Sequence, residues 1–234
     1  MMNTFIKNRK KDIKLSIFNP DFTCDEKVYF FLSAYMNTEW ETILDYGAGN
    51  SPYRSFFKYK KYITADVCQN DLNNIDLIIK DNSNSLDIKN DSFDLILCMD
   101  VLEHVEDIKY VIAELYRVLK KEGVLIINMP FIYREHEMPY DYARYTSIAI
   151  NHRLSESGFK KINVTKYGNL YFTLYSLWNE FTVKNNECKP TLIEKISRKL
   201  FNLFFLPLLN CTLFRINSKA NDSIYHHLFI IASK

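Results

Sequence analysis

The stretch that decides the fold is residues 43–54, which read ILDYGAGNSPYR. A short apolar run over residues 42–46 carries an acid, Asp45, near its end, and the chain then turns through Gly47 and Gly49. Glycine has no β-carbon, so it permits positive φ angles and lets the backbone approach a ligand closely. In α/β sheets, a turn of this kind after the first strand is where nucleotides bind. Taken alone, the motif is equally typical of an ordinary strand-to-helix turn.

Outward from this stretch, short apolar runs alternate with longer mixed segments. The runs are rich in Ile, Leu and Val, as strands buried on both faces of a parallel sheet are, and they cover residues 62–67, 77–80, 93–99 and 124–129. Apolar residues recur every three or four positions over residues 107–121, which predicts a helix that stops at Gly123. Further helices are predicted over residues 24–37 and 146–157, and final strands over 159–167 and 225–233.

This alternation predicts an α/β fold with a Rossmann-like, doubly wound sheet. We expect one domain over residues 1–234. Its predicted parts are an N-terminal helical extension (1–40), a cofactor-binding core (41–168), a helical insertion between the last two strands (169–222) and the final strand (223–234).

Composition excludes several classes of protein. The 234 residues include 16 Tyr and 17 Phe, enough aromatic side chains to build a core, which rules out a disordered chain. A net charge of +2 disfavours a nucleic-acid partner. The five cysteines form no CxxC pair, and the histidines and carboxylates lack ligand spacing, so we expect neither a disulfide scaffold nor a metal. The basic N-terminus has no apolar run behind it, so we expect a cytoplasmic protein.

A second acid supports a nucleotide-like cofactor. Asp66 ends the second predicted strand, nineteen residues after Gly47, where a carboxylate can accept hydrogen bonds from both hydroxyls of a ribose. The alternative is a solvated loop aspartate. NAD is the competing cofactor, but the NAD-binding sequence motif requires a glycine at position 52, where this chain has Pro52.

A third motif, DSFDLILCMDVLEHVED at residues 91–107, is informative together with the first two. The three resemble class I S-adenosylmethionine-dependent methyltransferases of the broad type-11 group, over about residues 40–165 and again in the last strand pair. The resemblance implies S-adenosyl-L-methionine as cofactor and seven strands, mostly parallel with an antiparallel last strand. It implies cofactor contacts at Asp45, Gly47, Ala48 and Gly49 (methionine part), Asp66 and Val67 (ribose), Asp81 and Asn82 (adenine), and Asp100 and Leu102 (beside the sulfonium).

The chain departs from this family in a way that resembles one of its subsets. The third glycine of the family falls at Ser51, and Pro52-Tyr53-Arg54 follows. This form, and the sequence EHEMPYDYARYT at residues 135–146, resemble polysaccharide-biosynthesis-associated methyltransferases. The resemblance implies a sugar hydroxyl as acceptor, on a glycan, a lipid-linked glycan or a nucleotide sugar.

The loop over residues 130–145 is the predicted substrate side of the site. Tyrosines suit sugar faces, and arginine binds carboxylates or phosphates in bidentate fashion. The predicted substrate-binding residues are Arg134, Tyr140, Arg144 and Tyr145. The alternative is a polar loop cross-linked by its own salt bridges. His104 and His136 are the candidate general bases, with a loop-fixing role as the alternative for His104.

The insertion contains the least conventional stretch. Residues 200–216 are mostly apolar but too short to span a bilayer. Residues 184–219 hold seven Lys or Arg against two Glu, a local balance of +5. This predicts peripheral contact with the inner membrane face through residues 190–216; a lid or a dimer contact is the alternative.

Two other functions stay open at this stage. One is a small-molecule or quinone-type methyltransferase, in which the insertion covers a hydrophobic acceptor. The other is a subunit that binds the cofactor but has no catalytic activity. The sequence leaves the oligomeric state undetermined.

Overall fold

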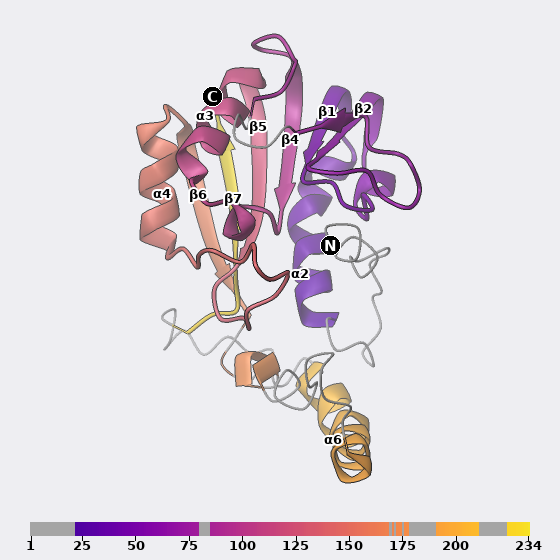
Figure 1. The fold of residues 1–234 in the computed structure, drawn as a ribbon. Coiled ribbons are helices and arrows are strands. Elements are labelled where there is room, and N and C mark those ends of the chain that lie inside the picture. Colours follow the sequence, from indigo (N-terminus) through magenta and orange to yellow (C-terminus); the bar gives the residue numbers. More distant parts are fainter. Residues whose placement is uncertain are drawn as a thin grey trace.

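The computed structural model describes residues 22–79, 85–168, 191–210 and 224–234, with six positions between 170 and 177. Seven strands form one sheet in the order β3-β2-β1-β4-β5-β7-β6 (Figure 1). The strands are β1 (Glu39–Tyr46), β2 (Lys58–Asp66), β3 (Leu77–Ile78), β4 (Phe93–Met99), β5 (Leu119–Pro130), β6 (Lys160–Tyr167) and β7 (His227–Ser233). β1 to β5 are parallel, and β7 runs antiparallel to both β5 and β6. The predicted fold class is confirmed.

Helices cover both faces of this sheet. The helices are α2 (Phe22–Met36), α3 (Ile108–Val118), α4 (Ser147–Glu156) and α6 (Leu192–Asn210), with two short 3-10 turns, η1 (Arg54–Phe56) and η2 (Leu102–His104). Successive residues of β4 point to opposite faces, as a strand requires. Leu95 and Leu97 pack in a cluster with Leu32 of α2, while Ile96 packs in a separate cluster with Leu115 of α3.

The helix predicted over residues 107–121 begins as expected but ends earlier. The Asp107 side chain accepts a hydrogen bond from the backbone N–H of Lys109, which caps the amino end of α3. The helix ends at Val118, because the fully buried Leu119 pairs with Phe93 as the first residue of β5. Gly123 therefore lies inside β5, at a shift in strand register, and does not stop the helix.

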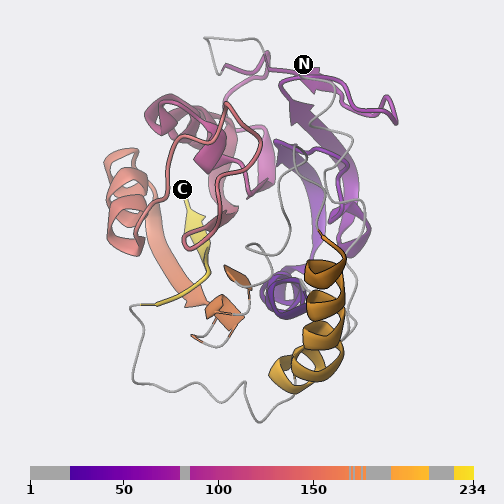
Figure 2. The same ribbon diagram turned by 60° about the horizontal axis from the view of Figure 1, so that its bottom comes forward.

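The predicted insertion contains a helix, since α6 lies between β6 and β7. Figure 1 shows α6 on the side where the parallel strands end, and Figure 2 brings that side forward. Among the described helices, none is both long and apolar enough to cross a membrane. Residues 1–21 of the predicted N-terminal extension and residues 211–216 of the apolar stretch lie outside the described residues.

Candidate active site

The candidate site lies at the carboxyl edge of the sheet. Because β1, β2, β4 and β5 are parallel, the loops that follow them gather at one edge. This edge holds the glycine turn after β1, the acid at the end of β2, the turn η2 after β4 and the loop after β5 (Figures 1 and 2).

The glycine turn is held against β2 by backbone hydrogen bonds. The N–H groups of Gly47 and Ala48 both donate to the carbonyl of Ala65, at 2.8 and 3.1 Å. Gly47 has a φ of +72°, and a β-carbon there would overlap the Val101 side chain. Position 47 therefore requires glycine on both conformational and steric grounds. Gly49 and Ser51 also have positive φ angles, +54° and +50°.

Two buried acids support the turn. Asp45 accepts a hydrogen bond from the Tyr62 hydroxyl at 2.8 Å, and burial raises the pKa of Asp45 to about 6. Asp66 accepts from the N–H of Gly49 at 2.8 Å and from the N–H of Val67 at 2.7 Å. Each carboxylate oxygen has two lone pairs and can accept more than one hydrogen bond.

Asn70, which the sequence patterns did not predict, fixes the tip of the glycine turn. Its side-chain N–H donates to the carbonyl of Gly49 at 2.6 Å, and its carbonyl oxygen accepts from the N–H of Asn74 at 3.2 Å. The loop after β2 is thereby joined to the loop after β1. An Asn after an acidic strand end is the only signal that the sequence offered.

Of the remaining predicted cofactor residues, only some have side chains at this edge of the sheet. Asp100 directly follows β4 with a φ of +56°, and its side chain is 43% exposed at the edge. The Leu102 side chain is fully buried in the apolar cluster beneath α3, so it does not reach the edge. Val67 is partly exposed beside Asp66. Asp81 and Asn82 lie outside the described residues.

Three strands converge on Asp100. The Asn128 side chain of β5 donates to Asp100 Oδ1 at 2.7 Å and accepts from the Tyr167 hydroxyl of β6 at 2.6 Å. His227 of β7 stacks on Tyr167, with its Nε2 3.9 Å from Asp100 Oδ1. Asn128, Tyr167 and His227 were not predicted, because contacts between neighbouring strands that are distant in sequence leave no local pattern.

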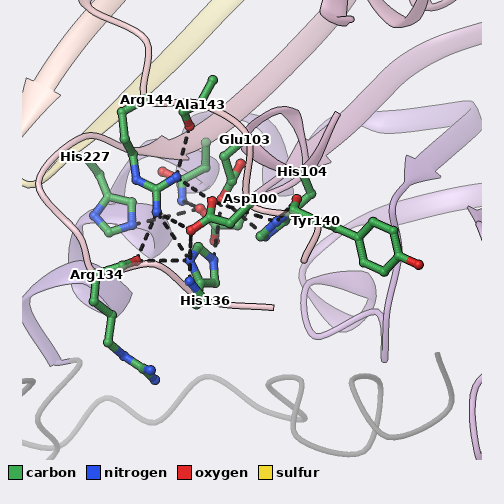
Figure 3. A network of polar contacts seen from close by, with 11 residues as sticks. Asp100, Glu103, His104, Arg134, His136, Tyr140, Ala143, Arg144 and His227 are labelled. Carbon is green, nitrogen blue, oxygen red and sulfur yellow. Dashed lines mark hydrogen bonds and ion pairs between the residues drawn. The ribbon is translucent and has the colours of Figure 1, made fainter. Parts of the chain in front are cut away.

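The loop over residues 131–146 folds back over η2. The N–H groups of Tyr142 and Ala143 donate to the carbonyl of Glu103, at 2.8 and 3.2 Å. This brings His136 against His104, with ring centroids 4.6 Å apart and planes at 72° (Figure 3). The structure therefore brings the two predicted bases together, although 32 positions separate them in the sequence.

Arg144 is engaged within this loop. It donates to both carboxylate oxygens of Asp141, at 2.6 and 2.7 Å, and to the backbone carbonyl of Arg134 at 3.0 Å. Burial raises the pKa of Asp141, but the bonds from Arg144 and from the His136 N–H outweigh it, so the pKa lies at about 2. The guanidinium fork is thus already occupied, as expected for a loop cross-linked by its own salt bridges. This geometry does not favour the predicted role of Arg144 in substrate binding.

Glu103 lies beneath the two histidines and is fully buried. Its carboxylate has no hydrogen-bond partner among the described residues. Oε1 of Glu103 is 3.9 Å from His104 Nε2 and 4.0 Å from His136 Nε2. Burial, and then the charge of Asp100, raise the pKa of Glu103 well above its usual range. Burial, and then His104, lower the pKa of His136. Glu103 was not among the predicted site residues.

The other predicted substrate residues are dispersed. The Arg134 side chain is exposed and points away from the histidines, and so does the phenol of Tyr140 (Figure 3). The backbone carbonyl of Tyr140 instead contacts His104 Nδ1 at 3.0 Å. Tyr145 packs partly against the core.

Comparisons with known proteins connect this edge with methyltransferases. The family Methyltransf_11, a methyltransferase domain, matches residues 44–127, from β1 to near the end of β5. An uncharacterized protein of Methanocaldococcus jannaschii is 33% identical over 118 residues, which cover 49% of this chain and 52% of that protein.

Solved structures share the fold at low identity. Phosphoethanolamine N-methyltransferase 2 of Haemonchus contortus, in complex with S-adenosyl-L-methionine, has a TM-score of 0.55 and is 14% identical; the match covers 89% of this chain and 52% of that one. A SAM-dependent methyltransferase of Archaeoglobus fulgidus has a TM-score of 0.54 at 13% identity, with 89% and 94% covered. The chain thus spans about half the length of the M. jannaschii and H. contortus proteins.

The fold is that of the class I S-adenosylmethionine-dependent methyltransferases. The match over residues 44–127 includes the glycine turn, Asp66 and the end of β4. The matching family is described as a methyltransferase domain, and the H. contortus structure is a complex with S-adenosyl-L-methionine.

Proposed function

We propose that this chain transfers the methyl group of S-adenosyl-L-methionine to a hydroxyl group of a small molecule or glycan. One observation carries the proposal: the glycine turn with its buried acids and the His104–His136 pair lie at the same edge of the sheet. The glycine turn and its acids suit the binding of a nucleoside, and the two histidines suit the removal of a proton from a hydroxyl group.

The residues present fit this cofactor. Asp66, an acid at the end of β2, is held in place by two backbone N–H groups. Asp66 would hold the ribose, and Asp45, Ala48 and the two glycines the methionine part. Bound S-adenosyl-L-methionine supplies an electrophilic methyl group on a sulfonium.

The chain's own contribution is to position the acceptor and remove its proton. Displacement at a methyl carbon depends mainly on proximity and alignment of the reacting groups. A hydroxyl acceptor must also lose its proton, and a base near neutral pKa accelerates that step. His136 is our candidate base, since burial lowers its pKa and so favours the neutral imidazole, the form that accepts a proton.

A sugar hydroxyl is the acceptor that we favour. Tyr140 and Tyr142, on the loop over residues 131–146, expose 43% and 47% of their surface, and aromatic faces of this kind pack against sugar rings. A hydrophobic, quinone-type acceptor is the second candidate, because α6 exposes apolar side chains on the same side of the sheet (Figure 1). A subunit that binds cofactor without turnover is the third.

Calorimetry tests the first part of the proposal. We expect the purified chain to bind S-adenosylhomocysteine, and Asp66→Asn to bind it roughly tenfold to hundredfold more weakly, since hydrogen bonds to a charged acceptor contribute about 1.5 to 3 kcal/mol. His152→Ala, on the exposed face of α4, is the matched control. No binding at millimolar concentration overturns the proposal.

Transfer assays test the acceptor. Methyl-labelled S-adenosyl-L-methionine is offered with a panel of nucleotide sugars, with glycan acceptors and with quinols. Label in the sugar fractions supports the favoured acceptor, and label only in quinols supports the second candidate. Cofactor binding without transfer to any acceptor favours the non-catalytic subunit.

A further inference from the structure

A three-residue cluster at the carboxyl edge has the composition of a metal site. Glu103, His104 and His136 each offer one ligand atom, and these atoms lie within 4.8 Å of one another (Figure 3). The sequence gives no hint of this, because only two of the three residues are adjacent. The loop over residues 131–146 completes the cluster when it binds the Glu103 carbonyl.

Both imidazoles are hydrogen-bonded through their Nδ1 atoms. His104 Nδ1 lies 3.0 Å from the carbonyl of Tyr140, which can only accept, so Nδ1 carries the proton. His136 Nδ1 faces two acceptors at 3.3 Å, a carboxylate oxygen of Asp141 and the carbonyl of Arg134. An Arg144 nitrogen is slightly farther, at 3.4 Å, and is already bonded to Asp141. In a neutral imidazole with a protonated Nδ1, Nε2 carries a lone pair.

The acceptor atoms of all three residues therefore face one another. Two nitrogen lone pairs lie about 4 Å from one oxygen of a fully buried carboxylate. That carboxylate has no hydrogen-bond donor among the described residues. Buried polar groups without partners are rare and costly, and each calls for an explanation such as a bound ion. A cation between the three atoms would satisfy them all at once.

We infer that Glu103, His104 and His136 bind a divalent first-row transition metal, with Zn²⁺ as the reference ion. Two imidazoles and one carboxylate suit this group of metals, whereas Mg²⁺ and Ca²⁺ prefer ligand sets made of oxygen. Three protein ligands leave at least one position open, as in catalytic zinc sites.

The surrounding residues are arranged as supports of a metal site. In metal-binding histidines, the ring nitrogen that does not bind the metal usually donates its N–H to a carboxylate or a backbone carbonyl, which fixes the ring and its tautomer. Here the Tyr140 carbonyl supports His104, and Asp141 supports His136. Ligand atoms around Zn²⁺ lie about 3.4 Å apart in a tetrahedron, so the two distances from Glu103 Oε1 to the imidazole nitrogens, 3.9 and 4.0 Å, must each shorten by about half an ångström.

A metal here would change the role of His136. Its Nε2 cannot be both a metal ligand and a base. With a metal bound, the substrate hydroxyl would bind the ion at its open position, and this would lower the pKa of the hydroxyl so that it loses its proton to solvent more readily. This use of the ion rests on the proposed methyl transfer, whereas ion binding itself does not.

Metal titration of the full chain tests the inference. After removal of metals with a chelator, the protein is titrated with Co²⁺, followed by its visible spectrum, and with Zn²⁺ in competition with a chromophoric chelator. We expect about one equivalent to bind with micromolar or tighter affinity and a spectrum of nitrogen and oxygen ligands. Glu103→Gln and His136→Ala should each weaken binding at least about tenfold, while His152→Ala binds as the natural chain does.

Three results would overturn the inference: no stoichiometric binding, a thiolate spectrum that assigns the ion to cysteines, or variants that bind as tightly as His152→Ala. His136 lies in a loop at the sheet edge, so its variant tests the site even if Glu103→Gln fails to fold. S-adenosylhomocysteine binding is measured on the same samples. If the protein binds the cofactor but no metal, only the metal site is refuted. If it binds metal but no cofactor, only the proposed function is refuted.

Discussion

Gly47 illustrates how much can depend on one missing β-carbon. A residue with a β-carbon would be strained at the φ of +72°, and its β-carbon would also overlap the Val101 side chain. The N–H groups of Gly47 and Ala48 hold the turn to β2, so any shift of the turn also displaces Asp66, which accepts from Gly49. If Asp66 holds the ribose, as we propose, a substitution at Gly47 lowers both stability and cofactor binding.

We expect Gly47→Ala to lower the free energy of unfolding by about 1 to 3 kcal/mol, because positive φ costs about 1 to 2 kcal/mol for a residue with a β-carbon and the overlap adds to it. Urea unfolding measures the change. The double variant Gly47→Ala/Val101→Ala removes the overlap but keeps the strain, so it should lose less than the sum of the single variants. Strict additivity would contradict the steric part of this account.

His136 is the residue whose role can be measured most directly. If it is the base, His136→Ala should lower the rate of methyl transfer about 10²- to 10⁴-fold. Activity of the natural chain should rise with pH through a pKa below about 6.5, since the neutral imidazole is the active form and burial lowers its pKa. A rate within about twofold of the natural chain would show that the histidine is no base.

At the scale of elements, the loop over residues 131–146 is cross-linked internally by the Asp141–Arg144 ion pair. Asp141 has a pKa of about 2, below the value of about 3.9 for an unfolded aspartate. A depressed pKa contributes stability that is fully present above the unfolded value and is lost as the pH falls through the folded value. The pair should thus support the loop at neutral pH and fail only below about pH 4.

We expect Asp141→Asn to lower the free energy of unfolding by about 1 to 3 kcal/mol at pH 7, because Arg144 loses its bidentate partner while half-buried. Urea unfolding at a series of pH values measures the difference between the two proteins. That difference should shrink as the pH falls from about 4 towards 2. A difference that stays constant over this range would show that the charge of Asp141 is not its cause.

The helix α6 exposes apolar side chains along much of its length. Its exposed apolar side chains recur at helical spacing: Leu192, Ile193, Ile196, Leu200, Leu203 and Phe204. A face of this kind beside basic residues is typical of helices that lie in a membrane interface. We therefore keep peripheral membrane contact through residues 190–216 as a proposal.

We expect the chain to float with vesicles that contain anionic phosphatidylglycerol, and Leu203→Asp/Phe204→Asp to float far less. Burying one such apolar side chain contributes about 1.5 to 3 kcal/mol, so loss of two should weaken binding at least about hundredfold. Ile148→Asp, at an exposed position of α4, is the matched control. Equal flotation of the natural chain and the α6 variant would leave a lid or a dimer contact as the role of this helix.

For the whole molecule, local patterns predicted the order of elements well. β4 has the predicted bounds, and α4 lies within one residue of its prediction at each end, because alternating burial and a Thr146 cap are local signals. The end of α3 was wrong because it was decided by Leu119 pairing with Phe93, a contact across the sheet. The predicted domain bounds and the roles of Asp81 and Asn82 stay predictions.

The sequence by itself determined the doubly wound sheet, its glycine turn and the acids that end β1 and β2, because strand periodicity and strand ends are properties of neighbouring residues. Only the tertiary structure decided what surrounds His104. Spacing along the chain gave no reason to expect a metal, yet the fold places Glu103 and His136 within about 4 Å of each other. The reason is physical: the amides of residues 142 and 143 bind the Glu103 carbonyl, and that long-range contact joins ligands which the sequence keeps apart.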